Sequence, residues 1–134
     1  MTRFVVDAPT LLHLVDSGLD VDPRHQLVGP NSVRTEALEL LLLAVRRGDR
    51  TDAGALEAHE RITELKMRLL GDRASRGLAW RIARERDWDT LHHAQYLAIC
   101  RLQADAVVTV DPEMAARAEG VVPVAPLQAL LPVT

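Results

Sequence analysis

Short apolar runs alternate with helical patterns along the whole 134-residue chain, and this alternation limits the fold more than any other feature. Strands are expected at residues 2–7, 25–30, 66–70, 105–111 and 121–124. Helical patterns are expected at residues 9–17, 31–49, 52–65, 73–86, 89–103, 112–120 and 126–131. Strands that alternate with helices favour a parallel sheet covered on both faces. We therefore predict an α/β protein, a three-layer α/β/α sandwich with a mostly parallel central sheet, formed by residues 1–134 as a single domain.

Composition excludes several classes of protein. Hydrophobic residues make up 48% of the chain and aromatic residues only 3%, so the core is expected to consist mainly of Leu, Val and Ala. No apolar run reaches the roughly 20 residues that a membrane span needs, so no membrane association is expected. Cys100 is the only cysteine, which rules out an internal disulfide and suits the cytoplasm. A net charge of −3 argues against a general polyanion binder.

Two of the predicted strands end on an aspartate that is followed at once by a helical pattern. Asp7 stands in "VVDAPT" and Asp111 in "VTVDPEM". In a parallel sheet, ligands bind at the carboxyl ends of the strands, where two carboxylates would repel each other unless a cation lay between them. Oxygen ligands suit Mg²⁺ or Mn²⁺. The alternative is that each aspartate only caps its helix.

Glu36 is a third acidic candidate. It lies in the first turn of the helix expected after the second strand. A carboxylate there can bind a metal or orient a water, or it can simply interact with the helix dipole. A cation held by Asp7 and Asp111 would lower the pKa of a bound water and offset the charge that develops on a phosphate, which is the chemistry of phosphodiester hydrolysis.

Three stretches carry a resemblance to a known family: "FVVDAPTLL", "GPNSVRTEALELL" and "HHAQYLAICRLQADAVVTVDPEMA". They resemble the PIN-domain nucleases, specifically the VapC-type toxins of bacterial toxin–antitoxin pairs, in order and spacing over nearly the whole chain. Asp7, Glu36 and Asp111 match three of the family's acidic positions. The resemblance implies a three-layer fold, Mg²⁺-dependent cleavage of RNA, and a homodimer inhibited by a small antitoxin protein.

The chain departs from the family's pattern at two positions. Pro9 stands where the family usually has Ser or Asn, and His93 stands where a further acid is expected. His93 either lines the site or is an ordinary surface or core histidine, and no role is assigned to the other four histidines. Asp89, four residues earlier on the expected helix, either compensates for the lost acid or caps that helix. Thr109, in the T-x-D sequence, is a further auxiliary candidate.

The His93 replacement predicts weak Mg²⁺ binding. It removes a negative charge and a hard oxygen ligand, whereas Mn²⁺ accepts an imidazole more readily. Cleavage is therefore expected to be weak and better supported by Mn²⁺. The alternative is a catalytically impaired PIN domain that binds RNA or an antitoxin without cleaving RNA.

Binding of RNA requires local positive charge. Residues 61–86 hold eight basic and three acidic residues. Arg68, Arg73 and Arg76 are the RNA-binding candidates, since arginine contacts phosphates and stacks on bases. The alternative is a solvated helix face. Trp80 and Trp88 lie within or next to this run and are expected to be core or interface anchors.

Overall fold

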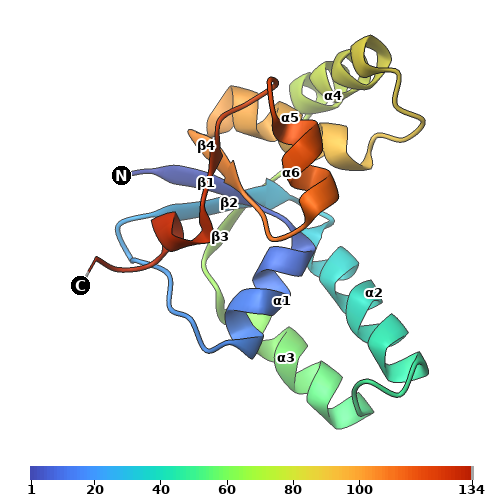
Figure 1. Cartoon of the computed structure of the whole chain (residues 1–134), viewed down its shortest axis with the longest axis vertical. Helices are drawn as coiled ribbons and strands as arrows, with labels where there is room; N and C mark the ends of the chain where they lie inside the picture. The colour runs from blue at the N-terminus through green and yellow to red at the C-terminus, as the bar shows by residue number, and fades with distance from the viewer. Residues whose placement is uncertain (134) are drawn as a thin grey trace.

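The computed structural model describes residues 1–133, and Thr134 lies outside the described residues. Five strands form one sheet in the order β3-β2-β1-β4-β5, and every neighbouring pair is parallel (Figure 1). The strands are β1 (Arg3–Val6), β2 (Gln26–Pro30), β3 (Met67–Leu70), β4 (Ala106–Val108) and β5 (Val124–Ala125). The predicted α/β class is confirmed, and the sheet is wholly rather than mostly parallel.

Helices lie on both sides of this sheet. They are α1 (Ala8–Asp16), α2 (Val33–Arg46), α3 (Asp52–Glu64), α4 (Arg73–Arg86), α5 (His92–Gln103), α6 (Pro112–Ala118) and the 3₁₀ helix η1 (Leu127–Leu130). Figure 1 shows α4 and α5 on one side of the strands and α1 and α3 on the other, with α2 packed beside α3. The three-layer α/β/α arrangement is therefore confirmed.

The core is built from the small and medium apolar side chains that the composition predicted. β4 is buried at all three positions, and β1 at its last three, as expected for central strands covered on both faces. Helix α1 has Pro9 in its first turn and buries Leu11 and Leu14 completely. Burial of each such side chain contributes roughly 1.5–3 kcal/mol, so the β1–α1 unit is firmly anchored.

The direction in which strands are added to the sheet reverses between β1 and β4, which makes this a topological switch point. From β1 the chain proceeds outward through β2 and β3, then returns to the other side of β1 to form β4 and β5. Val6 of β1 is in register with Val108 of β4. Asp7 and Thr109 therefore leave neighbouring strands at the same level, at the place where ligands bind in open parallel sheets.

The sequence-based predictions of where β4 ends and where α5 begins were wrong. β4 ends at Val108, so Thr109 to Asp111 form a turn and Asp111 does not end a strand. Helix α5 begins at His92 rather than at Asp89 or Thr90, so Asp89 does not share a helical face with His93. Asp87 ends α4 in a left-handed conformation (φ 57°, ψ 45°), and residues 88–91 then form a loop in place of the first turn predicted for α5.

Two helices carry apolar side chains in notable positions. Helix α2 buries Leu41 but exposes Leu42 and Leu43, so it is apolar on more than one face. Cys100 is buried on α5, and burial raises the pKa of its thiol to about 11, so it acts as a small apolar side chain.

Within residues 1–133, no helix is both long and apolar enough to cross a membrane.

Candidate functional site

A cavity of about 300 Å³ lies at the carboxyl ends of β1 and β4. The three acids predicted from the sequence all line it, although they come from separate parts of the chain. Asp7 follows β1, Glu36 lies on α2, and Asp111 precedes α6. His92 and Tyr96 of α5 form another part of the wall. The cavity is therefore an acidic site at the switch point of the sheet.

Asp7 is the most buried of these acids, with only 3% of its surface exposed. Its Oδ1 accepts hydrogen bonds from the backbone N–H of Thr10 (3.2 Å) and from the Thr10 hydroxyl. Its Oδ2 accepts a hydrogen bond from the Thr109 hydroxyl at 2.6 Å. Asp7 therefore caps α1, as the alternative interpretation predicted, and it is also fixed in orientation at the cavity wall.

The two threonine hydroxyls extend this network into the loop after β4. The Thr10 hydroxyl accepts from the backbone N–H of Val110 at 3.1 Å, and the Thr109 hydroxyl accepts from the backbone N–H of Asp111 at 3.0 Å. Each hydroxyl thus donates to Asp7 and accepts from the loop that carries Asp111. Sequence analysis missed Thr10, although its place three residues after the capping Asp7 is the usual spacing of such a contact.

Asp111 has one oxygen that the helix cap does not use. Its Oδ1 accepts from the backbone N–H of Glu113 at 3.0 Å, which makes it the N-cap of α6. Its side chain is 31% exposed, and Oδ2 lies 4.0 Å from Nε2 of His93. Capping and lining the cavity are therefore compatible for Asp111, as they are for Asp7.

Both oxygens of Glu36 face donors from α5. Oε1 lies 3.1 Å from Nδ1 of His92, and Oε2 accepts a hydrogen bond from the Tyr96 hydroxyl. The hydrogen bond with Glu36 raises the pKa of His92, because it favours the charged imidazolium. Burial, together with the same carboxylate, raises the pKa of Tyr96, so its hydroxyl remains a donor. Glu36 is thus partly neutralised within the protein.

His93, the residue singled out in the sequence, does not line the cavity. It is 7% exposed, and its Nδ1 lies 3.1 Å from Nη1 of Arg117. Arginine can only donate, so Nδ1 must accept and the neutral ring carries its proton on Nε2, which is the nitrogen nearer to Asp111. Burial, followed by the charges of His92 and Arg117, lowers the pKa of His93. His93 therefore contacts the site through Asp111.

The remaining predicted residues lie outside the acidic cavity. Asp89 is exposed in the turn before α5. Arg68 is exposed on β3, and Arg73 and Arg76 are exposed in the first turn of α4. Arg76 lines a separate cavity of about 260 Å³ beside the carboxyl end of β3. The sequence analysis missed His92 and Tyr96, although an H-H-x-x-Y pattern at the start of a helix placed both within reach of one face.

The donor set can be compared with what a divalent cation requires. Within residues 1–133, no three His, Cys, Asp or Glu side chains converge as a group that could hold a metal ion. Magnesium, however, usually keeps several waters and uses only one or two carboxylates. Asp7 and Asp111 both line the cavity, and among the described residues neither contacts a basic group closer than the 4.0 Å between Asp111 and His93, whereas Glu36 would have to leave His92 and Tyr96. The residues fit a water-rich site on two carboxylates.

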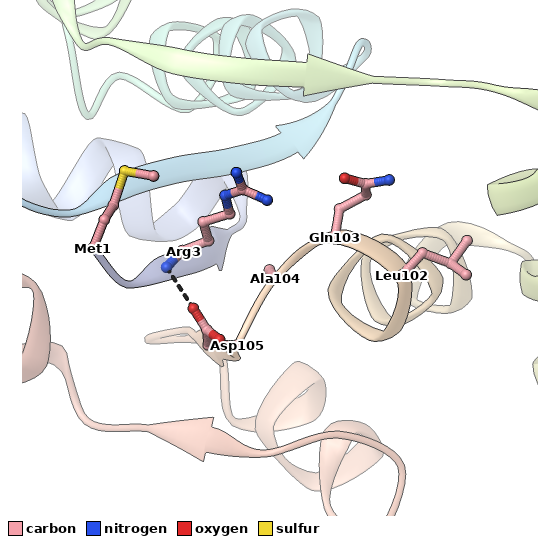
Figure 2. A pocket seen from close by; sticks show the side chains of 6 residues that line it. All are labelled: Met1, Arg3, Leu102, Gln103, Ala104 and Asp105. Carbon is pink, nitrogen blue, oxygen red and sulfur yellow. Dashed lines mark hydrogen bonds between the residues drawn. The ribbon is translucent and has the colours of Figure 1, made fainter.

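Another hollow lies at the opposite end of the sheet (Figure 2). It measures about 350 Å³ and lies between Met1, Arg3 and the segment from Leu102 to Asp105. The backbone N–H of Arg3 donates to the Asp105 carboxylate at 2.8 Å, which ties β1 to the entry of β4. This end holds the amino termini of the strands, where ligands of parallel sheets do not bind. The acidic cavity is therefore the better candidate site.

Comparison with solved structures supports the fold. The chain is similar to the crystal structure of PAE2754 from Pyrobaculum aerophilum, with a TM-score of 0.74 and 25% sequence identity. The similarity covers 96% of this chain and 92% of the other. No protein-family model matches the chain, and no curated protein sequence is significantly similar to it. The five-stranded parallel sheet in the order β3-β2-β1-β4-β5, flanked by helices, is a PIN-like fold.

Proposed function

We propose that this protein is a metal-dependent endoribonuclease that hydrolyses phosphodiester bonds of RNA. One observation carries the proposal: the three predicted carboxylates, from three separate parts of the chain, line one cavity at the switch point of a PIN-like sheet, and Glu39 of α2 adds a fourth. The resemblance of the sequence to PIN-domain nucleases at the same three acids agrees with it. Mg²⁺ or Mn²⁺ is the expected cofactor, since the available donors are oxygen atoms.

Each residue has a distinct role in this proposal. When bound, the cation would activate water for attack and offset charge on the phosphate. Asp7 and Asp111 would hold it, because each has an oxygen lone pair that its helix cap does not use. Thr10 and Thr109 keep Asp7 in one orientation. Glu36 would bind the cation or orient the attacking water after exchanging its contacts with α5.

The charges around the cavity bear on the choice of metal. The raised pKa of His92 favours the positively charged imidazolium beside Glu36, and His93 supplies no carboxylate next to Asp111. Both features weaken the attraction of the site for a hard divalent cation. We therefore propose that Mn²⁺ supports cleavage better than Mg²⁺ and that activity is weak.

A second candidate function is RNA or antitoxin binding without cleavage. The observation that favours it is the contact of both Glu36 oxygens with His92 and Tyr96, which leaves only two of the three predicted acids, Asp7 and Asp111, for a cation. Such a domain would bind the same partners but would not hydrolyse RNA.

The VapC resemblance further suggests a homodimer and a small antitoxin protein in the cytoplasm. A groove of about 310 Å³ between α2 and α3 supports binding of a protein partner, because it is largely apolar and is lined by Leu38, Leu42 and Leu56. A monomer in light scattering at high micromolar concentration would contradict the homodimer.

The decisive experiment measures cleavage of single-stranded and structured RNA with Mg²⁺ and with Mn²⁺. The wild type is compared with Asp7→Asn and Asp111→Asn, and Glu60→Gln on the exposed face of α3 is the control. We expect loss of cleavage of at least about 100-fold in both aspartate variants and no change in the control. Equal cleavage by wild type and Asp7→Asn would refute the nuclease, and RNA binding without any cleavage would favour the second candidate.

A further inference from the structure

The outward face of α4 carries an exposed tryptophan among arginines. The helix buries Leu78, Ala79, Ile82 and Ala83 against the protein, whereas Trp80 is 61% exposed. Of the two alternatives expected for Trp80, a core or an interface anchor, the core position is therefore excluded. We call the exposed face the Trp80 ridge, formed by Arg73, Arg76, Gly77, Trp80, Arg81 and Arg84.

Helical spacing places these side chains around the indole. Arg76 and Arg84 lie four residues before and after Trp80, and so they are its neighbours on the helix surface. Gly77, three residues before it, leaves bare backbone, and a methyl group built at Gly77 would meet nothing within 4 Å. Glycine costs a helix about 1 kcal/mol relative to alanine. The ridge therefore combines a flat, accessible aromatic face with open space beside it.

The ridge is also strongly positive. Helix α4 contains five arginines and a single acid, Glu85. Within residues 1–133, none of the ridge arginines forms an ion pair. Arg76 donates to the carbonyl of Gly71 at 2.7 Å, which holds its guanidinium near the start of α4. The other three guanidinium groups are free to meet an anion from solution.

The cavity beside the ridge and the acidic cavity are lined by adjacent residues at the start of α5. Arg76 lines the cavity of about 260 Å³ together with Leu91 and Gln95 at the start of α5. The residues that follow these two along α5, His92 and Tyr96, line the acidic cavity. One chain of nucleotides could therefore contact both places by crossing the first turns of α5.

We propose that the Trp80 ridge binds single-stranded nucleic acid, with a base stacked on Trp80 and phosphates contacted by the arginines. Stacking on an aromatic side chain together with neutralisation of the backbone is how proteins bind single strands without reading their sequence. RNA as the ligand rests on the proposed function. A second copy of the chain fits the ridge less well, because a two-fold contact would bring the same arginines face to face.

The test uses the Asp7→Asn protein, so that binding is measured without cleavage. Fluorescence anisotropy follows a labelled 12-nucleotide oligouridine and the oligodeoxythymidine of the same length. Trp80→Phe keeps an aromatic ring, whereas Trp80→Leu keeps only an apolar side chain. We expect Trp80→Leu to weaken binding on the order of 10-fold and Trp80→Phe to weaken it much less.

The charge contribution is tested with Arg84→Ala and with Arg46→Ala, an exposed arginine at the end of α2. Arg84→Ala should weaken binding and lower the dependence of affinity on salt, whereas Arg46→Ala should change neither. Equal weakening for RNA and DNA supports the ridge as a general single-strand site, and weakening for RNA alone supports it as an RNA site.

Two results would overturn the inference. One is unchanged affinity in Trp80→Leu. The other is a change in sedimentation rather than in affinity, which would assign the ridge to contacts between copies of the chain. The proposed function is judged separately, by cleavage. If the wild type does not cleave RNA but the ridge still binds it, only the nuclease proposal fails. If the wild type cleaves RNA and Trp80→Leu binds normally, only the ridge proposal fails.

Discussion

Asp7 and Glu36 line the same cavity but are held in different ways. Asp7 accepts hydrogen bonds from two threonine hydroxyls, which are uncharged and are themselves tied to the backbone of the loop after β4. Glu36 faces an imidazole whose pKa is raised and a phenol, both from α5. Uncharged donors orient a carboxylate and leave its charge available, whereas an imidazole with a raised pKa favours the charged form, which offsets the charge of the carboxylate. The cavity therefore has a fixed, anionic side and a neutralised side.

The largest effect is expected from Thr10→Ala on the fixed side. The change removes a buried hydroxyl that donates to Asp7 and accepts from the backbone N–H of Val110. An unpaired buried polar group costs about 1–3 kcal/mol. Urea unfolding should show a loss in the free energy of unfolding of that size. Thr10→Ser keeps the hydroxyl and should recover most of it, so equal losses in both variants would show that the hydroxyl has no such role.

The next largest effect is expected on cation affinity in the variant His93→Asp. The new carboxylate would lie beside Asp111, where only an imidazole stands now. We expect roughly a tenfold gain in Mg²⁺ affinity by calorimetry, with a parallel gain in RNA cleavage. His13→Asp, on the exposed face of α1, controls for the added charge alone. If both measurements stay unchanged, His93 is not near the cation and the match of α5 to the family's pattern is wrong.

A smaller effect is expected from His92→Ala on the neutralised side. The pKa of His92 is raised in the folded protein, so the charged form stabilises the fold at pH values below its ordinary pKa of 6.5. This contribution is lost as pH rises through the folded-state pKa. The side chain is 51% exposed, so the contribution is at most about 1 kcal/mol. The difference in Tm between wild type and variant should be larger at pH 5.5 than at pH 8.5, and a difference independent of pH would contradict the charged pairing with Glu36.

The smallest effect is expected at Asp22, which lies outside the cavity and titrates in the opposite direction. Hydrogen bonds from Arg24 lower the pKa of Asp22 from 3.8 to about 2. Its stabilising contribution is complete above pH 3.8 and is lost as pH falls through 2. The effect is small because the Arg24 side chain is 73% exposed. Asp22→Asn should lower Tm slightly at pH 5 and not at pH 2, and an equal decrease at both pH values would exclude this ion pair as the cause.

Much of the fold and half of the site could be predicted from the sequence. Apolar runs alternating with helical patterns are enough to specify a parallel sheet, because buried strands and crossover helices each have their own spacing. The convergence of Asp7 and Asp111 followed from their places after such runs, because the carboxyl ends of parallel strands meet at one edge. Glu36 followed from its place after the second strand.

Tertiary structure decided which of two adjacent histidines faces the cavity. Successive residues on a helix point about 100° apart, so His92 and His93 must meet different partners. Which one meets Glu36 depends on how α5 is rotated about its axis where it packs against α4, β1 and β2. No pattern within α5 contains this information.

The same limit applies to Thr10 and Trp80. The hydroxyl of Thr10 bonds to the backbone of Val110, 100 residues later, and such a contact exists only because β1 and β4 are neighbours. Trp80 lies on a helix with apolar residues on either side of it in the sequence, and packing of Leu78 and Ile82 against the protein turned the indole outward. The sequence alone therefore determined the sheet and the edge where the acids meet, because both depend on local spacing. The partners of each side chain were decided by contacts between distant segments, which local spacing does not encode.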